Sequence, residues 1–332
     1  MSPFYILHHR LKKPWRLPIL LALGLAGFWG FRFILDPAVA LIEAVNPAST
    51  GNIGGLGLPI IFSWLVGGMA AGLVAWGVGK ISLGLRSDYL AIATLGIGYI
   101  IVSFIKNEEW LTRGVKNVAG LPRPVPYEVD LQQSPAFIEF ANQIGIGVID
   151  LSSLTVKLCY SLLFGVVLLL LLWLMERAIH SPWGRMMRAI RDNEHAAEAM
   201  GKNVKGRHLR IFILGSAVLG IAGAMLVTLD GQFTPTAYQP LRYTFLIWVM
   251  VIVGGSGNNW GAMLGGFVIW FFWVEAEPIG HWLMEWATFY LAEDNLVRTH
   301  LLDAAVHMRL MVMGLILLLV LRFAPKGLLP ER

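Results

Sequence analysis

Long uncharged, apolar runs alternate with short charged segments along most of this chain. Two of the clearest runs, 158–175 and 211–229, hold 18 and 19 residues without a charge. An α-helix needs about 20 apolar residues to cross a membrane. The pattern therefore predicts an all-α, polytopic membrane protein with about eight transmembrane helices, at residues 17–35, 59–79, 89–105, 157–176, 211–229, 242–256, 261–279 and 303–322.

The composition supports a membrane protein. Of the 332 residues, 56% are hydrophobic and 14% are charged, whereas soluble domains carry about a quarter charged residues. The net charge of +5 does not indicate nucleic acid as a partner, because the Lys and Arg residues cluster beside apolar runs, as orientation signals do. The single cysteine, Cys159, cannot form a disulfide within the chain.

The distribution of basic residues predicts the orientation, since cytoplasmic loops carry an excess of Lys and Arg. With both termini in the cytoplasm, the N-terminal segment carries four, the loop after the second span two, the 177–210 loop eight and the C-terminal tail three of the 26 Lys and Arg residues. We expect a single transmembrane domain over 1–332, with an external loop at about 106–156. The basic N-terminus could also begin a secretory signal, but no small-residue cleavage site follows it.

Two predicted spans are weak. Only 32 uncharged residues lie between Arg242 and Glu275, whereas two full crossings need about 40. The region 242–279 is therefore either two tilted spans or a hairpin. The last span carries Asp303 and Arg309 in its first half. In the external loop, three prolines in five residues exclude regular structure, and 134–149 predicts a short amphipathic helix.

The chemistry of the spans disfavours two classes of membrane protein. Their centres are nearly empty of Asp, Glu, Lys and His, although secondary transporters usually place ionisable groups there. The Gly-Gly-Ser-Gly of "VGGSGNNWG" resembles the nucleophile motif of intramembrane serine proteases. That reading needs a neighbouring histidine, and His281 and His307 are predicted near the outer face. We favour a tight connection in which Asn258 and Asn259 satisfy backbone groups, and we expect no catalytic residue and no metal site.

Small residues in the spans indicate either a transport pathway or close helix packing, since both bring backbones together. The candidates are Thr94, Gly96, Tyr99, Gly220, Gly223, Gly254, Gly255 and Gly257. With few fixed charges nearby, a substrate with one unpaired charge is disfavoured. A zwitterion with an apolar side chain fits best, because helix ends can meet its charges, and neutral urea also fits.

The segment "RMMRAIRDNEHAAEAMGKNVKGRHLR" (185–210) stands out between two apolar runs. It combines helix-forming residues, mixed charges and a helix stop at Gly201. Such a segment is either a solvated cytoplasmic loop or a docking element for a partner.

These residues carry a family resemblance. His195-Ala196-Ala197-x-x-x-Gly201 is similar to the E-A-A-x-x-x-G pattern of ATP-binding-cassette permeases, with His in place of Glu. "GRMMRAIRDNEHAAEAMGKNV" more closely resembles the LivM-type permeases of branched-chain amino acid importers. "LRSDYLAIATLGIGYI", "IAGAMLVTLDGQFTP" and "LRFAPKGLLPE" agree in order, so the resemblance covers about 80–332. Tyr99 stands where that family often has Glu, and the family's G-Q-x-S-L-G-H-A-A-F-type segment is not found in 1–79.

The resemblance implies a non-catalytic permease subunit in a bacterial inner (plasma) membrane. The 106–156 loop would be periplasmic, and the 177–210 loop would couple to the ATPase through Arg188, Ala189, Arg191, Asn193, Glu194, His195, Ala196, Ala197 and Gly201. The implied partners are a second homologous permease, two cytoplasmic ATP-binding subunits, a periplasmic substrate-binding protein and membrane lipid. The chain itself would bind no cofactor, and ATP and Mg would be held by the ATP-binding subunits. A urea or short-amide importer is the alternative within the same class, and pairing of the permeases as homodimer or heterodimer stays open.

Overall fold

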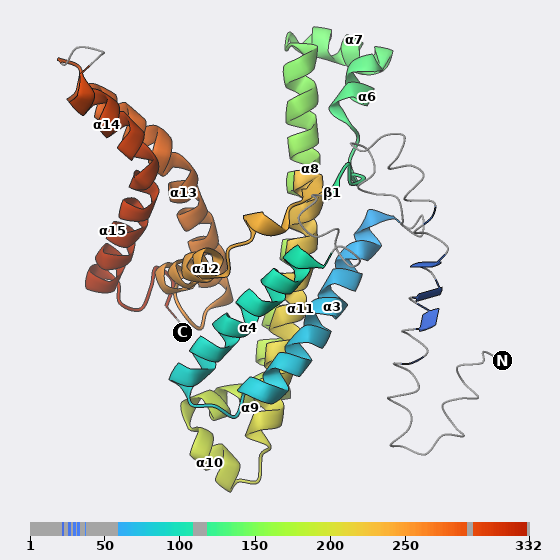
Figure 1. Ribbon diagram of the computed structural model, residues 1–332, viewed down its shortest axis with the longest axis vertical. Helices are drawn as coiled ribbons and strands as arrows, with labels where there is room; N and C mark the ends of the chain where they lie inside the picture. Colours follow the sequence, from blue (N-terminus) through green and yellow to red (C-terminus); the bar gives the residue numbers. More distant parts are fainter. Residues whose placement is uncertain are drawn as a thin grey trace. The chain divides into compact units, whose positions relative to one another are not determined.

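The computed structural model describes residues 59–108, 118–290 and 295–330, with a few isolated positions between 22 and 37. The described part of the chain is built almost entirely from α-helices (Figure 1). The predicted all-α class is therefore confirmed. The predicted first span, 17–35, lies largely outside the described residues.

The helices and strands have the following bounds: α3 Ile60–Ser82, α4 Ser87–Asn107, β1 Val118–Ala119, α6 Glu128–Gln133, α7 Pro135–Ile144, α8 Val148–His180, α9 Pro182–Asp192, α10 Glu194–Ala199, α11 Val204–Asp230, β2 Gln232–Phe233, η3 Pro235–Ala237, α12 Pro240–Gly254, α13 Asn259–Ala287, α14 Leu296–Ala304, η4 Ala305–His307 and α15 Met308–Phe323. The short amphipathic helix predicted in the external loop corresponds to α7. The proline-rich stretch before α6 has no helix, as expected.

Five described helices are long and apolar enough to cross a membrane: α3, α4, α8, α11 and α13. A sixth span arises if α14 and α15 act together, although they are bent by 56°. The prediction of one helix over 303–322 is thus wrong at its start, since the 3₁₀ turn of η4 interrupts it. The interruption falls between the charges of Asp303 and Arg309, where the segment is least apolar. Helix α12 has 15 residues, or about 22 Å, which is shorter than a hydrocarbon core of about 30 Å.

The described residues form two compact units, divided at positions inside α3, α4, α8 and α11. In unit 1, which comprises Met1–Lys80, Ser103–Tyr160 and Arg210–Thr236, α3 packs against α11 through small residues. The indole of Trp64 on α3 donates a buried hydrogen bond to Thr228 Oγ1 on α11 at 2.9 Å. Buried polar side chains need such partners, so this bond fixes the register of the two helices.

In unit 1, residues 118–133 are held by polar contacts to α8 and to the strand that follows α11. Gln132 of α6 donates to Ser152 Oγ of α8 at 2.8 Å. The two-residue strands β1 and β2 pair antiparallel, with Val118 opposite Phe233. These contacts connect this segment to α8 and to β2.

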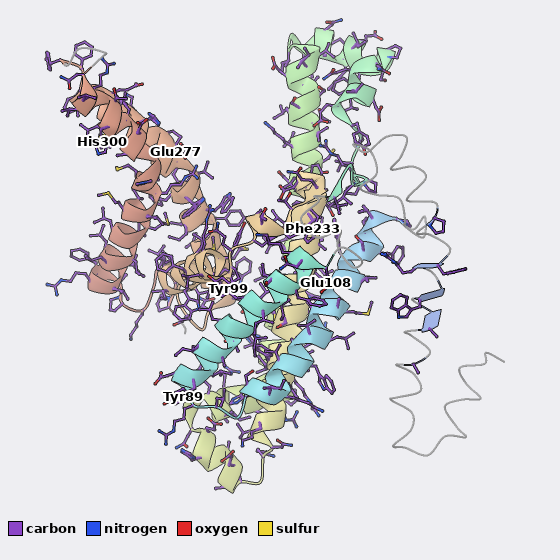
Figure 2. All side chains as sticks on the ribbon, in the orientation of Figure 1. Tyr89, Tyr99, Glu108, Phe233, Glu277 and His300 are labelled. Atoms are coloured by element: carbon purple, nitrogen blue, oxygen red, sulfur yellow. The ribbon has the colours of Figure 1, made fainter. Side chains whose placement is uncertain are left out.

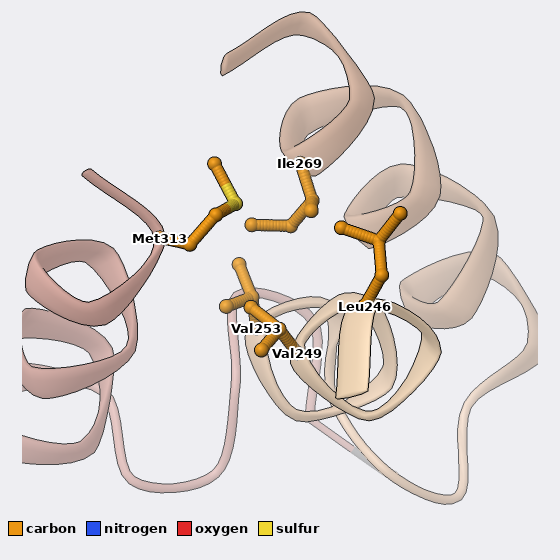
Figure 3. Close-up of a cluster of buried hydrophobic side chains, with 5 residues drawn as sticks. All are labelled: Leu246, Val249, Val253, Ile269 and Met313. Carbon is orange, nitrogen blue, oxygen red and sulfur yellow. The ribbon is translucent and has the colours of Figure 1, made fainter. Parts of the chain in front are cut away.

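Unit 2 comprises Ile81–Val102, Ser161–Leu209 and Ala237–Arg332, and its main core joins α12, α13 and α15. Five buried side chains form this core, and Figure 3 shows them: Leu246, Val249, Val253, Ile269 and Met313. The branched side chains of α12 meet one residue from each of the other two helices. Because lipid tails are as apolar as these side chains, van der Waals packing holds the three helices together.

The C-terminal tail completes the end of α12. The backbone N–H groups of Leu328 and Leu329 donate to the carbonyl oxygens of Val253 and Gly254, each at 2.9 Å. The last carbonyls of a helix have no partner within the helix. The tail supplies that partner, so the sequence "KGLLP" is held against the α12–α13 connection.

Candidate functional site

The charged segment after α8 folds into two short helices and the beginning of a third. Ser181 separates α8 from α9 and caps α9, because its Oγ accepts a hydrogen bond from Gly184 N at 3.3 Å. Pro182 occupies the first position of α9, where its missing N–H costs no hydrogen bond. Arg188 Nη2 donates to the Ile179 carbonyl oxygen at 3.4 Å, so this predicted coupling residue turns back toward the end of α8.

Asn193 closes α9 and opens α10. Its N–H donates to the Ala189 carbonyl oxygen at 3.1 Å, and its Oδ1 accepts from Ala196 N at 2.9 Å. Its extended backbone, with φ −155°, turns the chain between the two helices. Asparagine is among the best residues for this capping position, which explains its place directly before the Glu-His-Ala-Ala sequence.

The other end of α10 is closed by a glycine turn. Gly201 adopts φ +76°, its N–H donates to the Glu198 carbonyl, and the Lys202 N–H donates to the Ala197 carbonyl at 3.1 Å. This pair of bonds is a Schellman motif, which requires a left-handed residue and favours glycine. Helix α10 therefore ends where the sequence predicted a stop.

A small core joins these three segments. Ile190 of α9, Ala197 of α10 and Val204 of α11 are buried together, with Met186 and Met187 packed against them. Each segment contributes one buried residue, so α9, α10 and the start of α11 form one packed element. We call this element, residues 182–209, the coupling element, after the role that the family resemblance implies.

The outer surface of the coupling element is exposed over most of the predicted coupling residues. The exposed side chains are Arg188, Ala189, Arg191, Asn193, Glu194, His195 and Ala196. Met200, directly after α10, is 79% exposed. This surface therefore combines charged side chains, small alanines and one exposed methionine. Of the predicted coupling residues, Ala197 is buried and serves the core instead.

A polar contact ties the end of α8 to the start of α13. Asn259 Nδ2 donates to Glu176 Oε1 at 3.2 Å, and Glu176 also lies 3.7 Å from His180 Nδ1. The two partners are 83 residues apart, so no local pattern could have indicated the contact. It places the connection after α12 directly beside the helix that leads into the coupling element.

The glycines of "VGGSGNNWG" form a tight connection between α12 and α13. Gly255 and Gly257 have φ +116° and +92°, and a Cβ at Gly254 would overlap the Gly261 backbone. Asn258 caps α13 by accepting from Trp260 N at 3.0 Å. These three candidate glycines therefore lie together at a helix junction.

The protease reading requires a serine and a histidine in contact. Ser256 lies before α13, whereas His281 lies 22 positions after the first residue of α13, or about 33 Å along the helix. His307 lies on η4. Its neighbour Met308 lies close to Gly280, near the far end of α13 from Ser256. The described structure therefore brings no histidine of this pair to the serine.

The other pathway candidates fall into two groups. On α4, Thr94 donates within its own helix, to the Leu90 carbonyl oxygen at 2.8 Å. Gly96 has no heavy atom within 4 Å of an added Cβ, and Tyr99 is 47% exposed (Figure 2). In the described part of the chain this face of α4 is therefore open. It is not brought together with the glycine junction by any described contact.

Two further candidates lie on α11 and differ from each other. A Cβ at Gly220 would lie 2.6 Å from the Ala71 Cβ and 2.7 Å from the Gly67 carbonyl oxygen, both on α3. Gly223 has no heavy atom within 4 Å of such an atom. Gly220 is therefore a packing residue of unit 1, whereas Gly223 leaves open space.

The chain is similar to known transport permeases. A family model described as "Branched-chain amino acid transport system / permease component" matches residues 18–321. The high-affinity branched-chain amino acid transport permease LivM of Escherichia coli K12 is 27% identical over 257 residues, covering 75% of this chain and 56% of the relative. A probable LivM of Methanocaldococcus jannaschii is 30% identical over 158 residues, covering 47% and 42%. The fructose import permease FrcC of Rhizobium meliloti is 28% identical over 114 residues, covering 33% and 31%.

This chain spans about half the length of the curated relatives that it matches. No solved structure matches it significantly. The family model nevertheless covers most of the chain, and the resemblance to LivM-type permeases noted in the sequence is confirmed. Its long apolar helices and its coupling element occur within the matched residues. The chain belongs to the family of permease components of branched-chain amino acid transport systems, which are multi-pass membrane proteins.

Proposed function

We propose that this chain is the transmembrane permease subunit of an ATP-driven importer for branched-chain and other hydrophobic amino acids. The family match carries the proposal, because the match covers residues 18–321. The coupling element supports it, since its capped ends and shared core hold α10 rigidly against the two helices around it.

The subunit would work in an assembly. Its partners would be a second homologous permease, two cytoplasmic ATP-binding subunits and a periplasmic binding protein that delivers the amino acid. ATP and Mg would be bound by the ATP-binding subunits, and this chain would bind no cofactor. The exposed face of α10, with His195 and Met200, would dock on an ATP-binding subunit.

The geometry suggests how movement reaches the membrane helices. One residue, Ser181, separates α8 from α9, and Val204 of the shared core already belongs to α11. A force on α10 therefore acts on two helices that are long enough to span the membrane. The Asn259–Glu176 hydrogen bond would carry the movement to the start of α13.

The orientation belongs to the same proposal. We place both termini and residues 177–210 in the cytoplasm and residues 106–156 in the periplasm, within one permease domain of about eight spans. The excess of Lys and Arg in the cytoplasmic segments supports this orientation. In this arrangement α12 and α13 form a helical hairpin in which α12 is the shorter helix and α13 the longer one.

Uptake of labelled leucine by cells with and without the gene tests the function. We expect uptake to require the gene and to be blocked by excess unlabelled leucine, isoleucine or valine. Excess urea should leave it unchanged, and uptake of labelled urea in the same cells serves as the control. Blocking by urea but not by leucine would show that the amino-acid proposal is wrong.

A further inference from the structure

Three charged side chains from three helices of unit 2 meet around one indole ring. The guanidinium carbon of Arg242, at the start of α12, lies 5.0 Å from the centroid of the Trp273 ring on α13. The guanidinium carbon of Arg309, at the start of α15, lies 5.7 Å from the same ring. Arg309 also forms an ion pair with Glu277. Glu277, labelled in Figure 2, follows Trp273 by one helical turn.

The charges of this cluster do not balance. Two guanidiniums and one carboxylate leave one positive charge. Among the described residues, Arg242 contacts the Trp273 ring but forms no ion pair with a carboxylate. Arg309 Nε is buried and has no hydrogen-bond partner there. A buried unpaired donor costs free energy, so the cluster as it stands lacks an acceptor.

Part of the cluster lies at the surface of the described chain. The side chains of Arg309 and Glu277 are 33% and 30% exposed, and Arg242 is exposed. Arg242 also lies in the first turn of α12, which begins at Pro240, where the helix dipole favours a negative group. Its position adds to the attraction of the guanidinium for an anion.

We propose that this cluster binds the charged head of an amino acid zwitterion. The exposed guanidinium of Arg242 donates to the carboxylate, because guanidiniums bind carboxylates through paired N–H donors. Arg309, on the same ring, adds a second positive charge nearby. Glu277 accepts from the ammonium group, and the Trp273 ring forms an apolar wall beside the head group. The inference rests on the proposed function, since it locates the place where that substrate is held.

The negative charge of Glu277 selects the ligand. A simple oxyanion would be attracted by the guanidiniums but repelled by this carboxylate, whereas a zwitterion satisfies both signs. A phosphatidylethanolamine headgroup carries the same two charges, so the lipid is the other possible source of this chemistry. Vesicles with and without that lipid distinguish the two.

The test uses the complete transporter with its binding protein, reconstituted in phosphatidylcholine vesicles with and without phosphatidylethanolamine. Leucine transport and ATP hydrolysis are measured together with saturating leucine-loaded binding protein. The variants are Arg242→Gln, Arg242→Lys and Glu277→Gln. Glu285→Gln, an exposed carboxylate two turns further along α13, is the matched control.

We expect Arg242→Gln and Glu277→Gln to lower the leucine transported per ATP by about tenfold or more, as loss of a charged hydrogen bond predicts. Arg242→Lys should recover only part of the transport, because it keeps the positive charge but not the paired N–H donors of the guanidinium. Glu285→Gln should match the wild type in both lipids.

Unchanged transport by Arg242→Gln would overturn this inference and leave the proposed function standing. An equal loss in Glu285→Gln, or a loss that appears only with phosphatidylethanolamine, would also overturn it. Failure of the wild-type complex to transport leucine in either lipid would overturn the proposed function, and this inference with it.

Discussion

Replacing Gly201 with alanine tests whether the closed end of α10 is needed for coupling. Gly201 has φ +76°, a conformation that costs an L-residue roughly 1–2 kcal/mol. No heavy atom lies within 4 Å of the place where the new Cβ would stand. The cost is therefore conformational and not steric, so alanine is already an informative change.

The expected loss of stability can be compared with the small core of the coupling element. Its three buried residues are Ile190, Ala197 and Val204, and burial of a Val or Ile side chain contributes about 1.5–3 kcal/mol before chain entropy is subtracted. A penalty of 1–2 kcal/mol is thus a large part of the stability of this element. It raises the population with an opened α10 by about 5–30-fold.

The assay compares uptake of labelled leucine and the amount of protein in the membrane. We expect Gly201→Ala to lower uptake measurably at equal protein, because a smaller share of the molecules keeps α10 closed. Gly201→Asn should lose less, since asparagine tolerates the left-handed region. Gly165→Ala is the control, because it adds the same methyl group where no heavy atom lies within 4 Å and where the helical backbone accepts any L-residue.

If Gly201→Ala and Gly165→Ala both transport leucine like the wild type, the closed end of α10 has no role in coupling. The segment would then be a solvated loop that obeys the charge rule. If the amount of the Gly201→Ala protein in the membrane falls instead, the turn is needed for folding.

Further predictions concern orientation, docking and packing. In a chain without its native cysteine, a cysteine at Lys205 should react only from the cytoplasm and one at Gln132 only from outside; labelling of Lys205 in intact cells would contradict the orientation. Reversing the exposed charge in Arg191→Glu should abolish uptake while the protein stays in the membrane, since it would repel acidic groups on an ATP-binding subunit, and normal uptake would argue against this contact. Gly220→Val should lower the melting temperature in detergent, because overpacking costs about 1–3 kcal/mol. Gly223→Ala should leave the melting temperature nearly unchanged, and equal effects of the two variants would disprove the close approach of α3 and α11.

Features that depend on neighbours in the sequence could be predicted without the structure. The apolar runs predicted α8 and α11, because burial in lipid acts on each residue of a run. Asn193 and Gly201 mark the ends of α10, since capping bonds join residues only a few positions apart. The residues of the coupling element were found for this reason.

The ends of helices were predicted less well where charged residues fall inside a predicted span or where an apolar run is too short for two spans. The sequence predicted one helix over 303–322, but the structure divides it between α14 and α15 with a 56° bend. The question of 242–279 was open because 32 uncharged residues are too few for two full crossings. The structure has two helices of unequal length there, since the glycine junction and the C-terminal tail end α12 after 15 residues.

Contacts between distant positions were decided only by the tertiary structure. The sequence showed spans with few charges at their centres and gave no reason to group Arg242, Glu277 and Arg309 around Trp273. The Asn259–Glu176 bond joins residues 83 positions apart. Packing of separate helices brings such groups together, and periodicity within one helix carries no information about the partner helix or its register. The sequence by itself therefore determined the membrane class, the family and the ends of α10, whereas helix packing decided which charged side chains lie together.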